Sequence, residues 1–186
     1  IRMRDRQDLS VVLTEPAANS VLYDFARLPG VLRAEADRDA PVRLSHGPRS
    51  YRTAIGGLAP DSQMRPLLDQ RFQRVPVPSS GIVLNDRLAQ QLDLKLGDTV
   101  HLEVLQGARR QADLVVVAFS HELMQMSAGM ATDALNHLLG EGDALSGARL
   151  LIDAGQRDAL LRQLKQTPRV AAVTEIRDLS WQRAKD

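Results

Sequence analysis

Hydrophobic positions follow two different periods along this chain, and the changes between them mark the expected helices and strands. The apolar run 82–84 is too short for a helix and is typical of a strand. Asn85 then predicts the N-cap of a helix whose apolar face carries Leu88 and Leu92. Residues 99–104 alternate between polar and apolar, which predicts a half-buried strand. The segment therefore reads as strand, short helix, turn and strand.

A strand-helix-strand pattern occurs twice, once near each end of the chain. Residues 9–13 predict a strand, 21–28 a helix and 31–36 a second strand. The same apolar positions recur 139 residues later, the distance from Val11 to Leu150, without a gap. The matched pairs are Val11 with Leu150, Val12 with Leu151, Leu13 with Ile152, Val21 with Leu160, Leu22 with Leu161, Phe25 with Leu164, Pro29 with Pro168 and Val31 with Val170. This offset indicates an internal repeat.

Two such units far apart in sequence predict an α+β fold, in which a split ferredoxin-like subdomain of two βαβ halves carries an insertion. The insertion is expected to be a small β-barrel-like subdomain, with residues 114–118 buried on both faces. We place the ferredoxin-like subdomain at residues 1–75 and 148–178 and the β-rich insertion at 76–147. In this arrangement the two chain ends lie close together.

Composition excludes several classes of protein. The 186 residues are 44% hydrophobic, which is enough to bury a core. With 24 basic and 23 acidic residues the net charge is +1, so there is no electrostatic case for nucleic acid, and the few aromatic residues are scattered. The absence of cysteine excludes disulfides and thiolate metal sites. The longest apolar run, 114–119, is far shorter than the ~20 residues that span a bilayer.

The sequence carries no recognisable catalytic motif. We find no Gly-x-Ser-x-Gly elbow, no His-Glu-x-x-His, no phosphate-binding loop and no dinucleotide fingerprint. His46, His101 and His137 fall at polar positions and are expected on the surface. His121 with Glu122 could be a ligand pair or a general base, but no third group is spaced to orient it. The sequence therefore predicts a protein that is not an enzyme and binds no cofactor.

One cluster of unusual composition follows residue 119. It contains His121, Met124, Met126 and Met130 in a stretch made largely of Ser, Ala and Gly. Thioethers are adaptable apolar groups, and they are also soft ligands that favour Cu(I). Three interpretations stay open: packing over the barrel, contact with a partner or substrate, and a metal-relay site. Packing is preferred, and no metal site is predicted.

Several motifs together resemble the extracytoplasmic domain of the FtsX-like permeases of ABC transporters, a superfamily that includes MacB, LolC and LolE. These motifs are Gly81-Ile82, Leu88-Ala89, Leu92, Leu96-Gly97-Asp98-Thr99-Val100, Leu58-Ala59-Pro60 and the run 134–142. The last two are similar to the larger permeases of the superfamily. The resemblance implies that the ferredoxin-like subdomain corresponds to the one called the porter, and the insertion to the one called the sabre.

The resemblance also implies a function. We expect a non-catalytic domain on the periplasmic side of the bacterial inner membrane, which couples ATP-driven motion of membrane helices to substrate export or to lipoprotein or lipid handling. A cytoplasmic ATP-binding subunit is the implied partner, and a periplasmic adaptor or a lipoprotein is a candidate partner. Residues 179–186 are expected to lead toward a membrane helix beyond this fragment. The alternative is a periplasmic module that binds a metal or a partner through Met and His.

Two connecting segments are candidate hinges between the predicted subdomains. Pro76 and Pro78 interrupt regular structure before the β-rich core, and Gly142 and Gly147 bracket the return to the second half-sheet. A pivot at these residues would let the two subdomains move as rigid bodies. The sequence names no residue as a substrate ligand.

Overall fold

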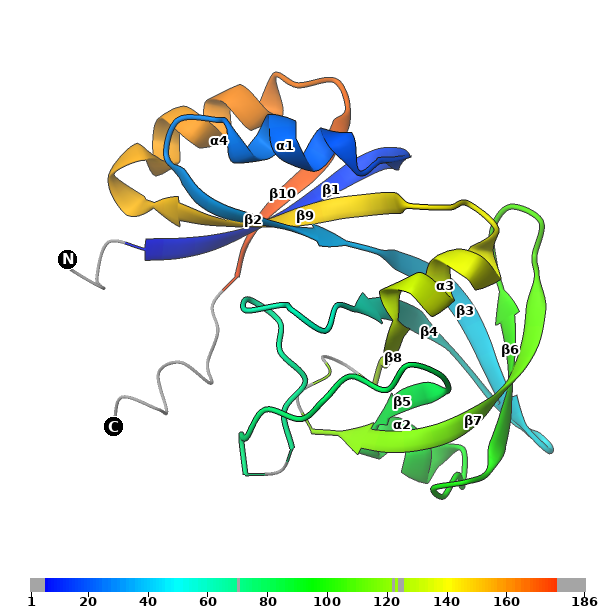
Figure 1. The fold of residues 1–186 in the computed structure, drawn as a ribbon. Helices are drawn as coiled ribbons and strands as arrows, with labels where there is room; N and C mark the ends of the chain where they lie inside the picture. Colours follow the sequence, from blue (N-terminus) through cyan, green and yellow to red (C-terminus); the bar gives the residue numbers. More distant parts are fainter. Residues whose placement is uncertain (1–5, 70, 122, 124–125, 177–186) are drawn as a thin grey trace. The chain divides into compact units, whose positions relative to one another are not determined.

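The fold is described from a computed structural model, which describes residues 6–69, 71–121, 123 and 126–176. The chain divides into two compact units. The first, here the sheet unit, consists of Ile1–Asp37 and Ala144–Asp186, and the second, here the barrel unit, of Arg38–Asp143 (Figure 1). None of the described helices is both long and apolar enough to cross a membrane.

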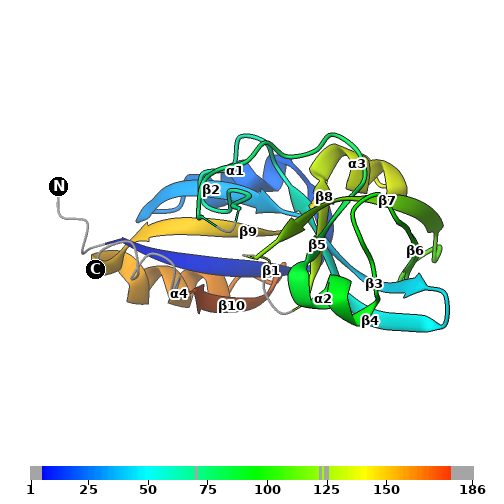
Figure 2. The same cartoon turned by 90° about the horizontal axis from the view of Figure 1, so that it is seen from below.

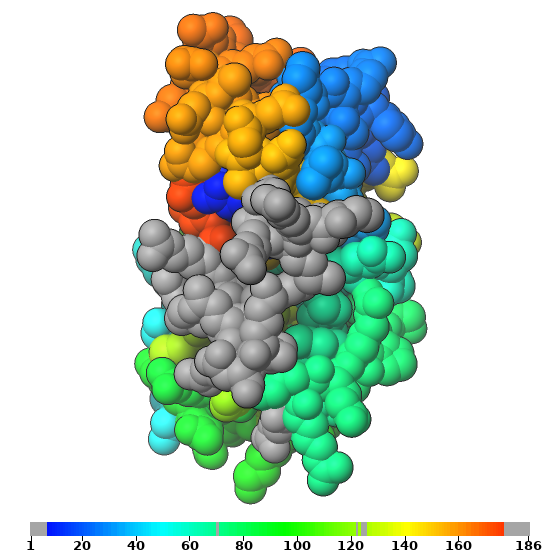
Figure 3. Space-filling model, turned by 90° about the vertical axis from the view of Figure 1, so that its left-hand side faces the viewer, coloured from blue at the N-terminus to red at the C-terminus, as the bar shows by residue number. Residues whose placement is uncertain are grey.

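The sheet unit is a four-stranded antiparallel sheet with two helices on one face. Its elements are β1 (Arg6–Ala18), α1 (Ser20–Ala26), β2 (Val31–Asp37), β9 (Ala144–Asp153), the short 3-10 helix η2 (Ala154–Gln156), α4 (Arg157–Lys165) and β10 (Val170–Ile176). The strand order is β10-β1-β9-β2 (Figure 2). Leucines such as Leu9, Leu150 and Leu164 are fully buried because they fill the layer between sheet and helices. Figure 3 shows the two halves side by side, in blue and in orange.

Strand pairing confirms the internal repeat. Val11 of β1 pairs with Val173 of β10. With the offset of 139 residues, Val11 corresponds to Leu150 and Ala34 corresponds to Val173. Leu150 of β9 pairs with Ala34 of β2, so the same contact occurs in both halves. The interruption between Val12 and Leu13 in the first ladder likewise recurs between Val31 and Arg33 in the second. Ser10 pairs with Arg149, and these two positions are each other's equivalents. The sheet unit is thus two βαβ halves related by an internal twofold axis through this pair.

The connections to the barrel unit leave the sheet at one end. Asp37, the last residue of β2, pairs with Gly147 near the start of β9. At the opposite end, Asp8 near the start of β1 pairs with Ile176, the last residue of β10. The start of β1 and the end of β10 are therefore adjacent, at the end of the sheet opposite to the connections.

The barrel unit is a closed six-stranded barrel with two short helices. Its elements are β3 (Asp39–His46), β4 (Arg49–Leu58), β5 (Ile82–Asn85), α2 (Asp86–Gln91), β6 (Thr99–Val104), β7 (Gln111–Ser120), β8 (Ala128–Ala131) and α3 (Thr132–Leu139), and the strand order is β3-β4-β8-β5-β7-β6. Val42, Leu44, Ile55, Leu84, Leu102 and Leu135 are fully buried and fill its interior. The α+β class with an inserted barrel is therefore confirmed.

The boundary of the insertion differs from the one predicted. The sequence placed it at residues 75 and 76, whereas β3 and β4 already belong to the barrel because they pair with β6 and β8. Alternation predicts that a segment is a strand but does not identify its partner strand. Pro76 and Pro78 lie instead in the connection 59–81, inside the barrel unit.

Candidate functional site

The methionine cluster lies where the chain passes from β7 to β8. Met124 and Glu122 lie outside the described residues. Met130 is 3% exposed and packs in the barrel core, which favours the packing interpretation for this residue. Met126 is half-buried against the same core and has a positive φ of 51°. The two described methionines thus pack against the barrel.

Asn85 holds this loop to the barrel. Its Oδ1 accepts from the backbone N–H of Arg87 at 3.0 Å and of Leu88, which caps α2 as the sequence predicted. Its Nδ2 donates to the carbonyl of Leu123 at 2.9 Å, and its backbone N–H donates to the carbonyl of Ser127 at 3.0 Å. The Asn85 side chain therefore joins the start of α2 to the loop at Leu123, and the Asn85 backbone holds the loop again at Ser127.

Two further contacts flank the loop. The hydroxyl of Thr53 donates to the carbonyl of Met126 at 3.0 Å, and His121 Nδ1 lies 2.8 Å from Asp86 Oδ2. Asp86 is in the first turn of α2, so this pair also ties the loop to the helix. Among the described residues, no group of three or more His, Asp or Glu is placed to hold a metal ion.

An apolar stripe on the outside of β7 leads to this loop. Val115, Val117 and Phe119 are 47%, 38% and 41% exposed, whereas Val116 between them is 1% exposed. The expectation that residues 114–118 are buried on both faces is therefore wrong, because only alternate residues of β7 face the barrel interior. Exposed side chains of this size suit contact with an apolar partner.

The predicted hinge residues lie in different surroundings. Gly142 adopts the left-handed conformation, with φ of 63°, in the short connection from α3 to β9. Gly147 lies inside β9, where a Cβ would overlap the carbonyl oxygen of Val11 on the neighbouring strand. Pro76 and Pro78 belong to the connection 59–81. The chain crosses between the units at residues 37–38 and 143–144, so only Gly142 adjoins a crossing.

Arg38, which sequence reasoning missed, is the first residue of the barrel unit and is only 2% exposed. Its Nε donates to Asn136 Oδ1 at 3.0 Å, and its guanidinium pairs with Glu141. Its backbone carbonyl accepts from the N–H of Gly57 at 2.7 Å. A buried cation is stable only when such partners replace water. Nothing in the sequence distinguishes this arginine, which stands between two aspartates on a polar stretch.

We call Arg38, Asn136 and Glu141 the neck cluster. Arg38 lies where the chain enters the barrel unit, and Asn136 and Glu141 lie shortly before it leaves. The cluster therefore ties the outgoing and returning connections to each other within the barrel unit.

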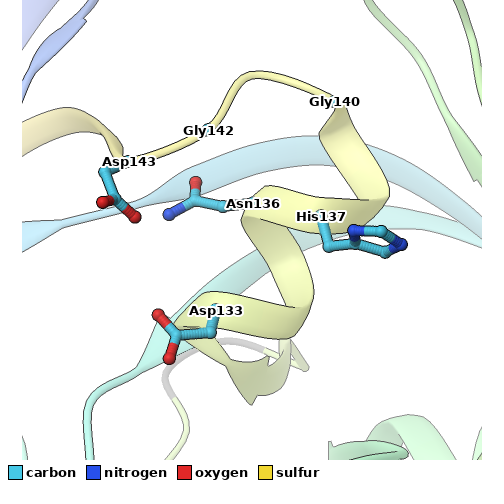
Figure 4. Close-up of a pocket in the computed structure, with 6 residues that line it drawn as sticks. All are labelled: Asp133, Asn136, His137, Gly140, Gly142 and Asp143. Carbon is cyan, nitrogen blue, oxygen red and sulfur yellow. The ribbon is translucent and has the colours of Figure 1, made fainter.

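A shallow hollow of about 300 Å³ lies beside this cluster. It is lined by Asp133, Asn136, His137, Gly140, Gly142 and Asp143. Figure 4 shows that the side chains of Asp133, Asn136 and Asp143 lie on one side of α3, whereas His137 points away from them. His137 therefore does not join the two carboxylates, and no metal-holding group of three is found among the described residues.

The sequence matches no protein-family model, and no curated protein matches it. The fold, in contrast, is similar to those of several solved structures. One is the extracellular domain of the noncanonic ABC-type transporter YknZ from Gram-positive bacteria, with a TM-score of 0.55 and 12% identity, covering 93% of this chain and 100% of that one.

The second is the periplasmic region of MacB from Actinobacillus actinomycetemcomitans. The TM-score is 0.52 and the identity 10%, and the match covers 96% of this chain and 92% of that one. At these identities the likeness establishes the fold. The resemblance to extracytoplasmic domains of MacB-type transporters is thereby confirmed at the level of structure.

Proposed function

We propose that this chain is the extracytoplasmic domain of an FtsX-like permease of the MacB type, located on the periplasmic side of a bacterial inner membrane. The observation that carries the proposal is the match to two transporter domains over nearly their whole lengths, which includes both units. The domain itself is non-catalytic. ATP hydrolysis is supplied by a cytoplasmic ATP-binding subunit that acts on the membrane helices of the permease.

The sheet unit is, in this proposal, a split ferredoxin-like subdomain equivalent to the porter, and the barrel unit corresponds to the sabre. The strand order β10-β1-β9-β2 supports it. If the four strands of the sheet unit are numbered 1 to 4 along the chain, their order in the sheet is 4-1-3-2. The elements follow one another as β-α-β-β-α-β, and all neighbouring strands are antiparallel, as in the ferredoxin-like arrangement.

The positions of the connections support a mechanical role. Motion applied where β1 begins and β10 ends enters the sheet at one end, and the barrel unit is attached at the other. Hydrogen-bonded strands resist stretching along their axes, so the sheet unit would transmit such a displacement rather than absorb it. This couples membrane-helix motion to substrate export, or to lipoprotein or lipid handling.

The neck cluster supports a hinge at the crossings themselves. Because Arg38 is fixed inside the barrel unit, rotation would concentrate at residues 37–38 and at 142–144, with Gly142 absorbing the change in backbone angles. Pro76 and Pro78 would instead let the connection 59–81 move on the barrel. The apolar stripe and the adjoining loop with Met124 and Met126 are the surface we assign to an adaptor or lipoprotein.

Removal of the barrel unit tests this function. Asp37 and Gly147 are neighbours on adjacent antiparallel strands, so a short hairpin can replace residues 38–143 in the full-length permease. We expect the shortened protein to copurify with an ATP-binding subunit and to retain ATP hydrolysis while transport is lost. The intact permease is the control. If no ATP-binding subunit copurifies with the intact protein, the proposal is wrong.

A further inference from the structure

The internal twofold axis makes the two edge strands of the sheet unit directly comparable. Among the described residues, β2 and β10 each have one neighbouring strand, so each leaves one edge open. With the offset of 139 residues, Arg33 and Glu35 of β2 correspond to Ala172 and Thr174 of β10. Because the internal twofold axis relates these positions, a difference in residue type between them distinguishes one edge strand from the other.

The β2 edge carries three charged residues, Arg33, Glu35 and Asp37, whereas β10 carries one. Arg33 Nε donates to Glu35 Oε1 at 3.0 Å, and such charges on an edge strand oppose pairing with a further strand. The single charge in β10, Glu175, is paired with Arg157 of α4. Both edges have the same bulge, so a bulge cannot account for any difference in pairing.

We propose that β10 is an interaction surface for a second copy of this chain, whose β10 pairs with it antiparallel about a twofold axis at Val173. In this register Val173 faces its own copy, Ala172 faces Thr174, and Ala171 faces Glu175, so no like charges meet. The proposal follows from the fold and is independent of the proposed transport function, so either can fail alone.

The neighbouring helix supports a second copy as the occupant. α4 follows β9 and leads back into β10, so a twofold axis at β10 places the two α4 helices antiparallel. Asp158 in the first turn of one helix, which already pairs with Arg157 of the same turn, then lies on the side of Arg162 and Lys165 in the last turn of the other. A second copy brings this basic last turn to the interface, which favours it as the occupant.

A single pair of seven-residue strands buries little surface, so the association should be weak. Contacts below the usual interface size are seen at high concentration, or when both copies are held together at an effective concentration of ~1 mM. We therefore expect self-association of the isolated chain only toward that range.

An exchange of edge residues tests the proposal. The double variant A172R/T174E gives β10 the residues of β2, and the reverse variant R33A/E35T gives β2 the residues of β10. Sedimentation up to ~1 mM should show a mass that rises toward the dimer for the unmodified chain, none for A172R/T174E, and larger species for R33A/E35T. An unmodified chain that stays monomeric overturns the proposal, and so does association that A172R/T174E leaves unchanged.

If circular dichroism shows that A172R/T174E does not fold, two single-cysteine variants test the pairing of β10 instead. The chain has no cysteine, so Val173→Cys introduces a single thiol on the proposed axis. Residues directly opposite in an antiparallel pair lie within disulfide range. Mild oxidation should yield dimers of Val173→Cys but not of Ala34→Cys, its equivalent on β2. Equal yields, or no dimer from either, would refute the pairing.

Discussion

In the sheet unit the buried side chains are almost all apolar, whereas the barrel unit buries an arginine, two asparagines and two serines. The sheet unit needs few polar contacts because its strands are antiparallel neighbours joined through two helices. The barrel closes through parallel pairs, β4 with β8 and β5 with β7, which require long connections. Backbone N–H and C=O groups in those connections need hydrogen-bond partners, and buried polar side chains such as Asn85 provide them.

The comparison shows which contacts each unit depends on. Apolar packing and close strand approach stabilise the sheet unit, and a few polar anchors hold the barrel unit together. Substitution of an anchor should therefore destabilise the barrel unit selectively, and a change of strand spacing should destabilise the sheet unit selectively.

Arg38→Ala should have the largest effect. It removes a buried cation and leaves Asn136 without its main partner, which should lower the free energy of unfolding of the barrel unit by about 3 to 4 kcal/mol. Urea denaturation measures the loss, and hydrogen exchange shows whether Val42 and Leu102 lose protection while Leu150 does not.

Glu141→Gln is the matched control for the neck cluster. The Glu141 side chain is 45% exposed, so its charge contributes at most about 1 kcal/mol. Equal losses for Arg38→Ala and Glu141→Gln would mean that the ion pair, rather than the buried guanidinium with Asn136, supplies the stability.

Gly147→Ala should destabilise the sheet unit by about 3 kcal/mol. The new Cβ would overlap the backbone carbonyl oxygen of Val11, and two central strands cannot separate without disturbing the core beneath them. Gly155→Ala is the control, since the nearest atom to its Cβ would be 3.4 Å away. The difference in urea midpoint between the two variants measures the effect. If Gly147→Ala leaves the free energy of unfolding unchanged, the close approach of β1 and β9 does not require this glycine.

The sequence predicts the sheet unit better than the barrel unit. Its helices and strands occur twice at one offset, and buried residues such as Leu150, Leu160 and Leu164 have the periodicity of their elements. Periodicity also identifies most barrel strands. It does not reveal which strands pair, and β3 was therefore assigned to the wrong side of the boundary.

The candidate site was predicted in part. The sequence located the loop after β7 and the cap at Asn85, because both have recognisable composition. It missed the neck cluster, since Arg38 and Glu141 are 103 residues apart and meet only when the barrel closes. It also placed Gly147 in a connection, because a glycine required by close strand approach has the same sequence signal as a glycine in a turn.

Asn85→Ala should cost about 1 to 2 kcal/mol, because it removes the cap of α2 and the bond to Leu123. Hydrogen exchange of the backbone N–H of residue 85, which donates to the carbonyl of Ser127, should accelerate, since the loop loses an anchor. Asn19→Ala is the control, because Asn19 precedes α1 without making a side-chain cap. If both substitutions have the same effect on stability, the contacts of Asn85 are not what stabilises this part of the barrel unit.

Asp113→Asn should have the smallest effect and tests whether polar contacts on the barrel surface matter as the buried ones do. The pKa of His101 is raised above 6.5, mainly by its hydrogen bond with Asp113, against an opposing contribution from burial and with further help from Gln111. A pKa that is higher in the folded chain stabilises it fully below pH 6.5, and this contribution is lost as the pH rises through the folded value. An NMR titration of His101 should show a lower pKa in Asp113→Asn, and a smaller decrease in Glu103→Gln, because Glu103 acts only through its charge. Since both partners are exposed, stability at neutral pH should hardly change. A loss comparable with that of Asn85→Ala would show that the barrel unit depends on surface polar contacts as well as on its buried anchors.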